Sequence, residues 1–199
     1  MQRPRLVGGA GVFRECLERD VPLVRERYWP TPWCVEARLQ TVLASVLRTW
    51  LLPRERYHRQ VLMLADGGQV ALDWMETECA EGAPVLLVLP GLTGASQAEY
   101  VRCVCGAARA LRLRCVVFNN RGLGGLPLTS PRLYCAASHD DLAEVIHAVR
   151  EAAPGVPLLA VGVSLGGLIL GNYLAAHGAH AELHAALIIS SPLNVPKGT

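Results

Sequence analysis

From residue 84 onward, short apolar runs alternate with longer stretches in which apolar residues recur at helical spacing. The apolar runs are bounded by Gly and Pro and predict buried strands, whereas the longer stretches predict helices. This alternation favours a mostly parallel sheet with helices on both faces, which is an α/β fold. In chain order the predicted elements are strand 84–89, helix 96–111, strand 114–118, helix 139–152, strand 157–161, a helix that ends near Ala176, and strand 185–189.

The residues before this alternation form two further segments. Two β-rich runs, 58–64 and 69–74, flank an Asp-Gly-Gly turn signal at 66–68, so we expect an antiparallel hairpin. Prolines break residues 1–56 into short pieces, and we interpret them as an N-terminal cap segment on a main domain at 57–199. We expect the chain to form one structural unit.

An amphipathic run in the cap segment, 39–52, predicts a helix that packs on a core. A lipid surface is the alternative, and we rank it lower because basic residues do not line the polar side of the helix. No stretch of the chain approaches the roughly 20 apolar residues that cross a bilayer. Arg3 and Arg5 are followed by Gly-rich sequence, which is not the core of a signal peptide. We therefore expect no transmembrane segment and no signal peptide in this chain.

Composition narrows the classes of function. A length of 199 residues with 51% hydrophobic residues suits a single core. A net charge of +2 without any run of Lys or Arg argues against nucleic acid as a partner. The seven cysteines lack the paired spacing of a zinc site, so we expect reduced thiols in a cytoplasmic setting, with no metal and no organic cofactor.

One motif carries chemistry. Gly162-Val163-Ser164-Leu165-Gly166 has the form G-x-S-x-G between an apolar strand and an apolar helix, which is the context that this motif requires. A strand that turns at once into a helix strains its central residue, and the flanking glycines remove Cβ atoms that would clash. The bend presents Ser164 at the helix N-terminus, where the Leu165 N–H can meet a negative oxygen. We predict that Ser164 is a nucleophile; the alternative is a Gly-rich turn that only packs helix on strand.

An oxyanion hole needs a second donor, which this architecture takes from the loop after the third strand. That loop is 90–94, Pro-Gly-Leu-Thr-Gly. Gly91 lets the backbone approach a substrate, and the Leu92 N–H is the predicted donor, with the Thr93 hydroxyl as an additional candidate. The alternative is a tight turn with no further role.

The glycine-rich loop 121–125 resembles a dinucleotide fingerprint only superficially. Pro127 and Pro131 prevent a helix from opening directly beneath its glycines. We interpret the loop as a mobile rim of the active-site cleft.

Taken together, these motifs resemble the abhydrolase-domain phospholipases and esterases of the AB hydrolase superfamily, family 4. The resemblance runs from about Arg3 to Ser190 and implies a membrane-associated serine hydrolase that acts on phospholipid or other carboxylic esters, with Ser164 matching the nucleophile. Family members carry an N-terminal membrane anchor ahead of this segment and continue past the sixth strand to supply the catalytic Asp and His. We therefore expect a truncated form. The matching segments are 3–7, 28–33, 66–69, 73–74, 89–94, 117–122, 131–135 and 160–167.

A serine nucleophile needs a base and an orienting carboxylate, which in this fold follow it in the chain. After Ser164, His177 lies about 20 Å along a continuous helix. We expect it, like His180 and His184, to be solvent-facing or at a helix end. His139 is the one conceivable substitute.

His139, however, lies in a segment that is better interpreted as a capping box. Ser138 would be the N-cap and Asp141 the third residue of the helix. The acid and the base are therefore expected to lie outside the chain.

These observations predict a carboxylic ester hydrolase that works through an acyl-serine on lipid or small esters, impaired by an incomplete triad. The alternative is a non-catalytic form that binds a partner or lipid. Loss of further strands would expose an apolar sheet edge that invites pairing with another chain. A membrane surface is a further candidate partner, and the oligomeric state is left open.

Overall fold

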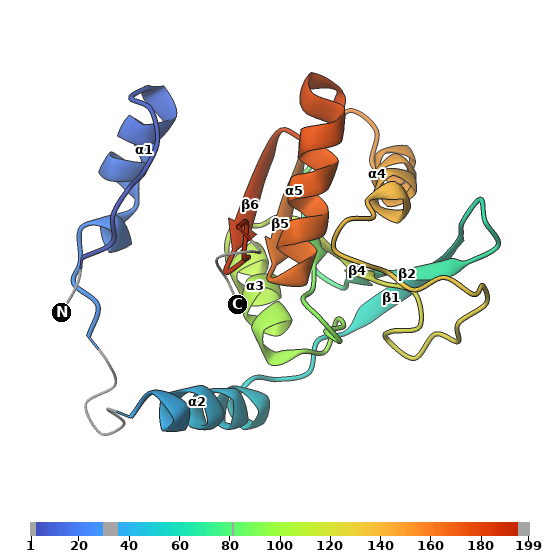
Figure 1. Cartoon of the computed structure of the whole chain (residues 1–199), viewed down its shortest axis with the longest axis horizontal. Helices are drawn as coiled ribbons and strands as arrows, with labels where there is room; N and C mark the ends of the chain where they lie inside the picture. The colour runs from blue at the N-terminus through green and yellow to red at the C-terminus, as the bar shows by residue number, and fades with distance from the viewer. Residues whose placement is uncertain (1–2, 30–35, 81, 195–199) are drawn as a thin grey trace. The chain divides into compact units, whose positions relative to one another are not determined.

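The computed structural model describes residues 3–29, 36–80 and 82–194 (Figure 1). The chain divides into two compact units, Met1–Arg48 and Thr49–Thr199. The predicted boundary after residue 56 and the predicted packing of the cap segment on the main domain stay predictions. Residues 30–35 and 195–199 lie outside the described part of the chain. The first unit contains α1 (Val12–Asp20), a 3-10 helix η1 (Pro22–Val24) and most of α2 (Ala37–Leu51). The helix predicted at 39–52 is thus confirmed.

The second unit contains a six-stranded, mostly parallel sheet in the order β1-β2-β4-β3-β5-β6 (Figure 1). β2 runs antiparallel to β1 and β4, and the pairs β3–β4, β3–β5 and β5–β6 are parallel. The fold class and the hairpin predicted from the sequence are confirmed. The strands are β1 (Tyr57–Met63), β2 (Gln69–Met75), β3 (Val85–Leu89), β4 (Arg114–Asn119), β5 (Leu158–Val163) and β6 (Ala185–Ile189).

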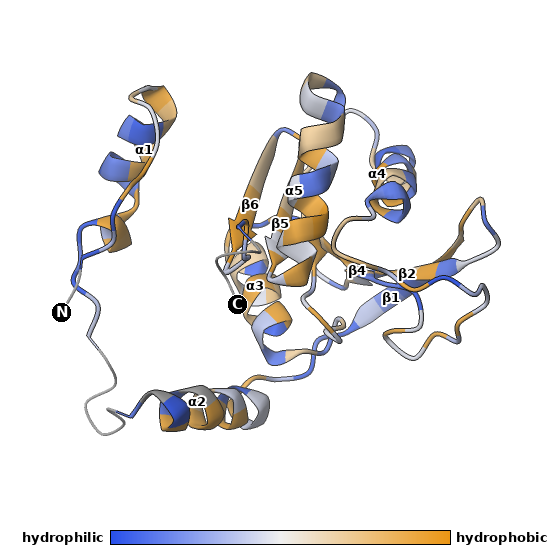
Figure 2. Cartoon of the chain, in the orientation of Figure 1, coloured by the Kyte–Doolittle hydropathy of each residue, from blue (hydrophilic) through white to orange (hydrophobic). Residues whose placement is uncertain are grey.

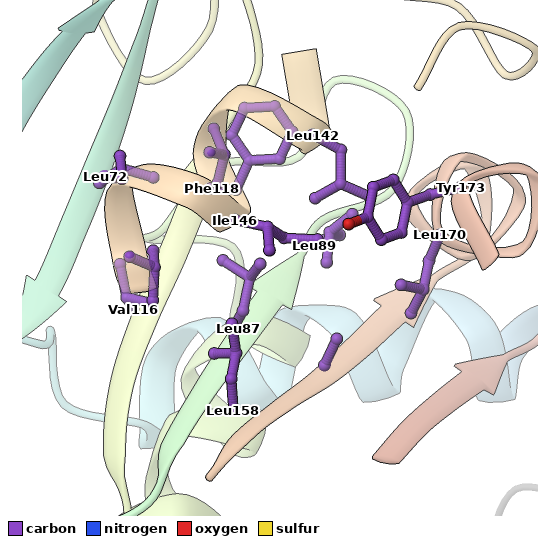
Figure 3. Packing of buried hydrophobic residues seen from close by; sticks show 14 of the residues in the cluster. Leu72, Leu87, Leu89, Val116, Phe118, Leu142, Ile146, Leu158, Leu170 and Tyr173 are labelled. Atoms are coloured by element: carbon purple, nitrogen blue, oxygen red, sulfur yellow. The ribbon is translucent and has the colours of Figure 1, made fainter. Parts of the chain in front are cut away.

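Helices cover both faces of the sheet. This explains why the central strand β3 is apolar throughout. Leu87 and Leu89 pack in a cluster with residues of α4 and α5 such as Ile146 and Tyr173 (Figure 3). Residues that alternate with them in β3 pack in a second cluster, with residues of α3. Successive strand side chains point to opposite faces, so a strand covered on both faces needs apolar residues throughout. The helices are α3 (Glu99–Ala110), α4 (Asp140–Ala152), α5 (Leu165–His177) and the 3-10 helix η2 (Gly178–His180).

The strand β6 differs from β3 although both are apolar. Figure 2 shows hydrophobic colouring along β5 and β6. β6 lies at one edge of the described sheet, and its side chains are mostly exposed. Across the described residues, none of the helices has the length and apolar character needed to cross a membrane.

Two details of the predicted helices are wrong. The helix predicted to begin at residue 96 begins at Glu99, because Ser96 belongs to the preceding loop, where its N–H donates to Asn119 Oδ1 at 2.9 Å. The predicted capping box at Ser138 is absent: the N-cap of α4 is His139, and it makes no side-chain cap bond.

The expected third residue of that capping box, Asp141, has another partner. Arg121 Nε and Nη2 donate to the two carboxylate oxygens of Asp141 at 2.5 and 2.7 Å. The same guanidinium pairs with Asp66 at 2.8 Å and donates to Ser130 Oγ at 2.9 Å. Only 1% of the Arg121 side chain is exposed. One buried cation therefore joins the hairpin turn, the loop after β4 and the start of α4, and Gly68 leaves space for it, since a Cβ there would overlap the guanidinium.

Arg121→Met should lower the free energy of unfolding by about 3–5 kcal/mol, because it removes both hydrogen-bonded donors of the buried Asp141 carboxylate and leaves it only the more distant Arg132, 3.7 Å away. Urea unfolding followed by circular dichroism measures this. The matched control is Arg54→Met at an exposed arginine, expected to change stability by no more than about 0.5 kcal/mol. Equal losses in the two variants would show that the buried pair has no special weight.

Candidate active site at the bend between β5 and α5

Ser164 lies at a sharp bend where β5 becomes α5. Its φ of 52° and ψ of −115° are strained for a residue with a side chain. Two hydrogen bonds hold the bend. Ser164 N–H donates to Ile189 O in β6 at 2.9 Å, and Ser191 Oγ, just after β6, donates to Ser164 O at 2.7 Å. Ser164 itself is half-buried. The geometry is that of the strand-to-helix turn predicted for G-x-S-x-G.

The glycines around Ser164 are required by close approach of backbone. A Cβ on Gly162 would lie 2.6 Å from Gly166 O. A Cβ on Gly166 would overlap the carbonyl oxygens at the end of β3, those of Leu89 and Pro90. The motif therefore lets β5, α5 and the end of β3 meet without side chains between them.

The loop after β3 contacts this bend. A Cβ on Gly91 would lie 3.2 Å from Ser164 Cβ, so little space separates the two segments. Gly94 N–H donates to Gly91 O at 2.9 Å, which closes residues 91–94 into a β-turn. The structure thus brings together the serine and the loop that the sequence singled out separately.

The backbone N–H groups of Leu92 and Leu165 were the predicted oxyanion donors. In the part of the chain that the structure describes, no acceptor is recorded for the N–H of Leu92 or of Leu165. Leu165 is the first residue of α5, where an N–H has no partner within the helix. The Thr93 hydroxyl, the additional candidate donor, instead donates to Leu92 O at 2.7 Å.

An open cleft of about 520 Å³ lies beside these groups, and its lining is mostly apolar. Leu92 and Leu165 both line it, together with residues of the loop 121–125 that was predicted to form its rim. Arg121 of that loop is fixed by its ion pairs. The remaining lining residues are Gly122, Leu123, Leu133, Tyr134, Cys135 and Ala136.

Within the described residues, no hydrogen bond joins Ser164 Oγ to a histidine. His139 packs against the rings of Tyr173 and His177, two or more turns along α5 from Ser164. His177 ends α5, as predicted, and its Nδ1 lies 2.9 Å from Tyr173 O. His184 Nδ1 accepts the Leu158 N–H at 3.2 Å, at the opposite end of β5 from the bend.

Sequence reasoning missed a buried polar cluster that fixes the loop after β3. Arg59 donates to both carboxylate oxygens of Asp73, at 2.6 and 2.7 Å, and Asn119 Nδ2 donates to the same carboxylate at 2.9 Å. Ser96, which follows the turn 91–94, donates its hydroxyl to Asp73. An Asp among the apolar residues 70–75 of β2 was the signal that could have pointed to this cluster.

The charge of Asp73 is stabilised despite its burial. Burial raises the pKa of the Asp73 carboxyl. Hydrogen bonds from Arg59, Ser96 and Asn119, together with the charge of Arg59, lower it by more, so the pKa lies below its usual range. No group of three or more potential metal-ligating side chains occurs among the described residues.

Comparison with known proteins identifies the class. A family model described as alpha/beta hydrolase fold matches residues 84–198, and the chain belongs to this family. It is 42% identical over 195 residues to phospholipase ABHD3 of Mus musculus, a match that covers 95% of this chain but 47% of the relative, so this chain spans less than half of that protein. It is 27% identical over 177 residues to monoacylglycerol lipase ABHD2 of Mus musculus. This match covers 87% of this chain and 42% of the lipase.

The esterase Pf2001 of Pyrococcus furiosus has a similar structure, with a TM-score of 0.58 at 17% identity, over 72% of this chain and 54% of that chain. This likeness supports the fold alone. The family resemblance inferred from the sequence is confirmed at the level of the α/β-hydrolases and of similarity to phospholipase ABHD3.

Acidification should destabilise the domain through Asp73. A carboxyl with a lowered folded-state pKa contributes stability that is fully present above its ordinary pKa of about 3.9 and is lost as the pH falls through that value toward the folded one. We expect the melting temperature to drop below about pH 4 and the Asp73→Asn variant to show a lower melting temperature at pH 7 with a shallower acid drop.

Part of the slope should persist in Asp73→Asn, because Arg121 lowers the pKa of Asp66 as well. Glu151→Gln, which changes an exposed carboxylate paired with His147, is the control and should keep the wild-type slope. An unchanged acid slope in Asp73→Asn would show that the cluster is not what couples stability to pH.

Proposed function

We propose that Ser164 is the nucleophile of a carboxylic ester hydrolase and that the N–H groups of Leu92 and Leu165 stabilise the oxyanion. The observation that carries this proposal is the strained Ser164 backbone, held against a turn whose central N–H has no recorded acceptor in the described residues. Strain of this kind persists only when the surrounding structure enforces it, and it concentrates at functional sites.

The chemistry follows from this placement. Ser164 Oγ attacks the ester carbonyl carbon as a base removes its proton, and the carbonyl oxygen becomes an oxyanion that accepts from the two N–H groups. Collapse of the tetrahedral intermediate breaks the bond to the alcohol, which leaves with a proton, and an acyl-serine remains. Water then hydrolyses the acyl-serine. No metal or organic cofactor takes part in this scheme.

The proposed substrate is a lipid ester. The apolar cleft beside Leu92 and Leu165 suits an acyl chain, and the relatives named above are a phospholipase and a monoacylglycerol lipase. We further propose that the protein works at a membrane surface from the cytoplasmic side, where such esters are reached. A phospholipid or a shorter carboxylic ester would satisfy the same site.

The acid and the base are proposed to lie outside residues 165–194. His177 and His184 are hydrogen-bonded elsewhere, and His180 is exposed in η2 beyond the end of α5. An enzyme that loses a triad member keeps a rate acceleration of roughly 10³ to 10⁴ over water, from binding and oxyanion stabilisation. The same observation favours the second candidate function, a non-catalytic form that binds lipid or a partner protein.

Reaction with a fluorophosphonate probe tests the nucleophile. Ser164 Oγ attacks phosphorus and fluoride leaves, so we expect covalent labelling of this chain that disappears in Ser164→Ala. Ser138→Ala, at a serine outside the cleft lining, should be labelled like the wild type. Intact-protein mass spectrometry and hydrolysis of a short-chain ester are the measurements.

Added imidazole tests the proposed absence of a base. A soluble base accepts the proton that no described histidine is placed to accept, so labelling and ester hydrolysis should accelerate with imidazole concentration in the wild type but not in Ser164→Ala. A folded wild-type protein that resists labelling with imidazole present would refute the hydrolase proposal and leave the binding function.

A further inference from the structure

Two tyrosine hydroxyls accept hydrogen bonds from the backbone of the turn 91–94. Gly91 N–H donates to Tyr100 Oη at 2.9 Å, and Thr93 N–H donates to Tyr134 Oη at 3.2 Å. Tyr100 belongs to α3, directly after the turn, whereas Tyr134 comes from the long connection between β4 and α4. Residues separated by 41 positions in the chain therefore meet at this turn.

Three of the four backbone N–H groups of the turn 91–94 donate hydrogen bonds within the protein. Those of Gly91 and Thr93 are used by the tyrosines, and that of Gly94 donates to Gly91 O. For the Leu92 N–H, between the two held ones, no acceptor is recorded in the described residues. Every backbone N–H is a strong donor, so the two tyrosines define which group of the turn is free to bind an oxyanion.

The turn also needs external support. Thr93 has a φ of 58°, in the left-handed region that β-branched residues avoid. Leu92 and Thr93 are exposed, so packing around their side chains does little to keep the turn in place. A strained and exposed turn relaxes unless neighbouring groups hold it.

We propose that Tyr100 and Tyr134 are positioning residues that aim the Leu92 N–H at the oxyanion formed at Ser164. This inference rests on the proposed function, because it assumes that an oxyanion forms there. Neither hydroxyl touches the reacting atoms in this scheme. Each acts through the backbone of the turn.

The two tyrosines differ in their surroundings. Tyr100 Oη fills the space that a side chain at residue 94 would occupy, so the glycine there and the phenol are matched. Burial raises the pKa of the Tyr100 hydroxyl above its ordinary value. Tyr134 instead lines the cleft beside Leu92 and Leu133, so one side chain contacts both the turn and the space assigned to the acyl chain.

Removal of single hydroxyls tests the proposal. The rate of Ser164 phosphonylation by a fluorophosphonate probe, measured in imidazole buffer against probe concentration, separates the maximal rate from the half-saturating concentration. We expect Tyr134→Phe and Tyr100→Phe each to lower the maximal rate about 10-fold with an unchanged half-saturating concentration, because a displaced donor weakens only the transition state.

Tyr173→Phe is the matched control. It removes a buried tyrosine hydroxyl that donates to Ala181 O at 2.9 Å, far along α5 from the turn, so it should lower stability but leave the labelling rate of the folded protein unchanged. A loss of labelling in Tyr173→Phe equal to that in Tyr134→Phe would reduce the effect to general destabilisation and overturn the proposal.

Amide hydrogen exchange gives a second readout that does not depend on labelling. The Thr93 amide should exchange faster in Tyr134→Phe, and the Gly91 amide in Tyr100→Phe. Should Tyr100→Phe fail to fold, Tyr134→Phe alone carries the test, since its partner Thr93 is exposed.

The outcomes separate this inference from the proposed function. A labelled wild type with equally fast labelling in both Phe variants would overturn the positioning role and leave the hydrolase standing. A folded wild type that is never labelled would overturn both. Unchanged exchange of Thr93 in Tyr134→Phe would show that the hydroxyl does not hold the turn.

Discussion

The bend at Ser164 depends on backbone segments that touch without side chains between them, and the rest of the site is built around that contact. Gly166 faces the carbonyl oxygens at the end of β3, and Gly91 faces Ser164 itself. A Cβ at either place would push the serine and the turn 91–94 apart. The sheet order, with β3 and β5 as parallel neighbours, is what carries both segments to the same edge.

Buried charges then fix the loops that surround this contact. Asp73 holds Ser96 and so the far end of the loop after β3, while Arg121 joins the hairpin turn to α4. Each charge is largely removed from water and is tolerated because several donors or acceptors surround it. Ionic groups thereby tie these loops to the sheet, whereas apolar side chains of the strands and helices form the core.

Much of the fold followed from patterns within short stretches. β6 agrees with its predicted range, and α4 and β5 agree to within one or two residues, because apolar runs and helical periodicity are local properties. Ser96 and Ser138 show the limit: each resembled the start of a helix in sequence, yet tertiary partners recruited Ser96 into the Asp73 cluster and made Asp141 a partner of Arg121. Local capping preferences of about 1 kcal/mol give way to such bonds.

The sequence alone determined the α/β class, the serine at the bend, the loop expected to face it and the resemblance to lipid hydrolases, since all of these depend on residue types at fixed spacing. Only the tertiary structure decided which polar side chains act together. Three sets of partners show this: Asp73 with Ser96, Arg121 with Asp66 and Asp141, and the turn 91–94 with Tyr134. The partners lie 20 to 55 positions apart in the chain. Their meeting depends on strand order and on connections between strands, and no local pattern in a single sequence encodes those.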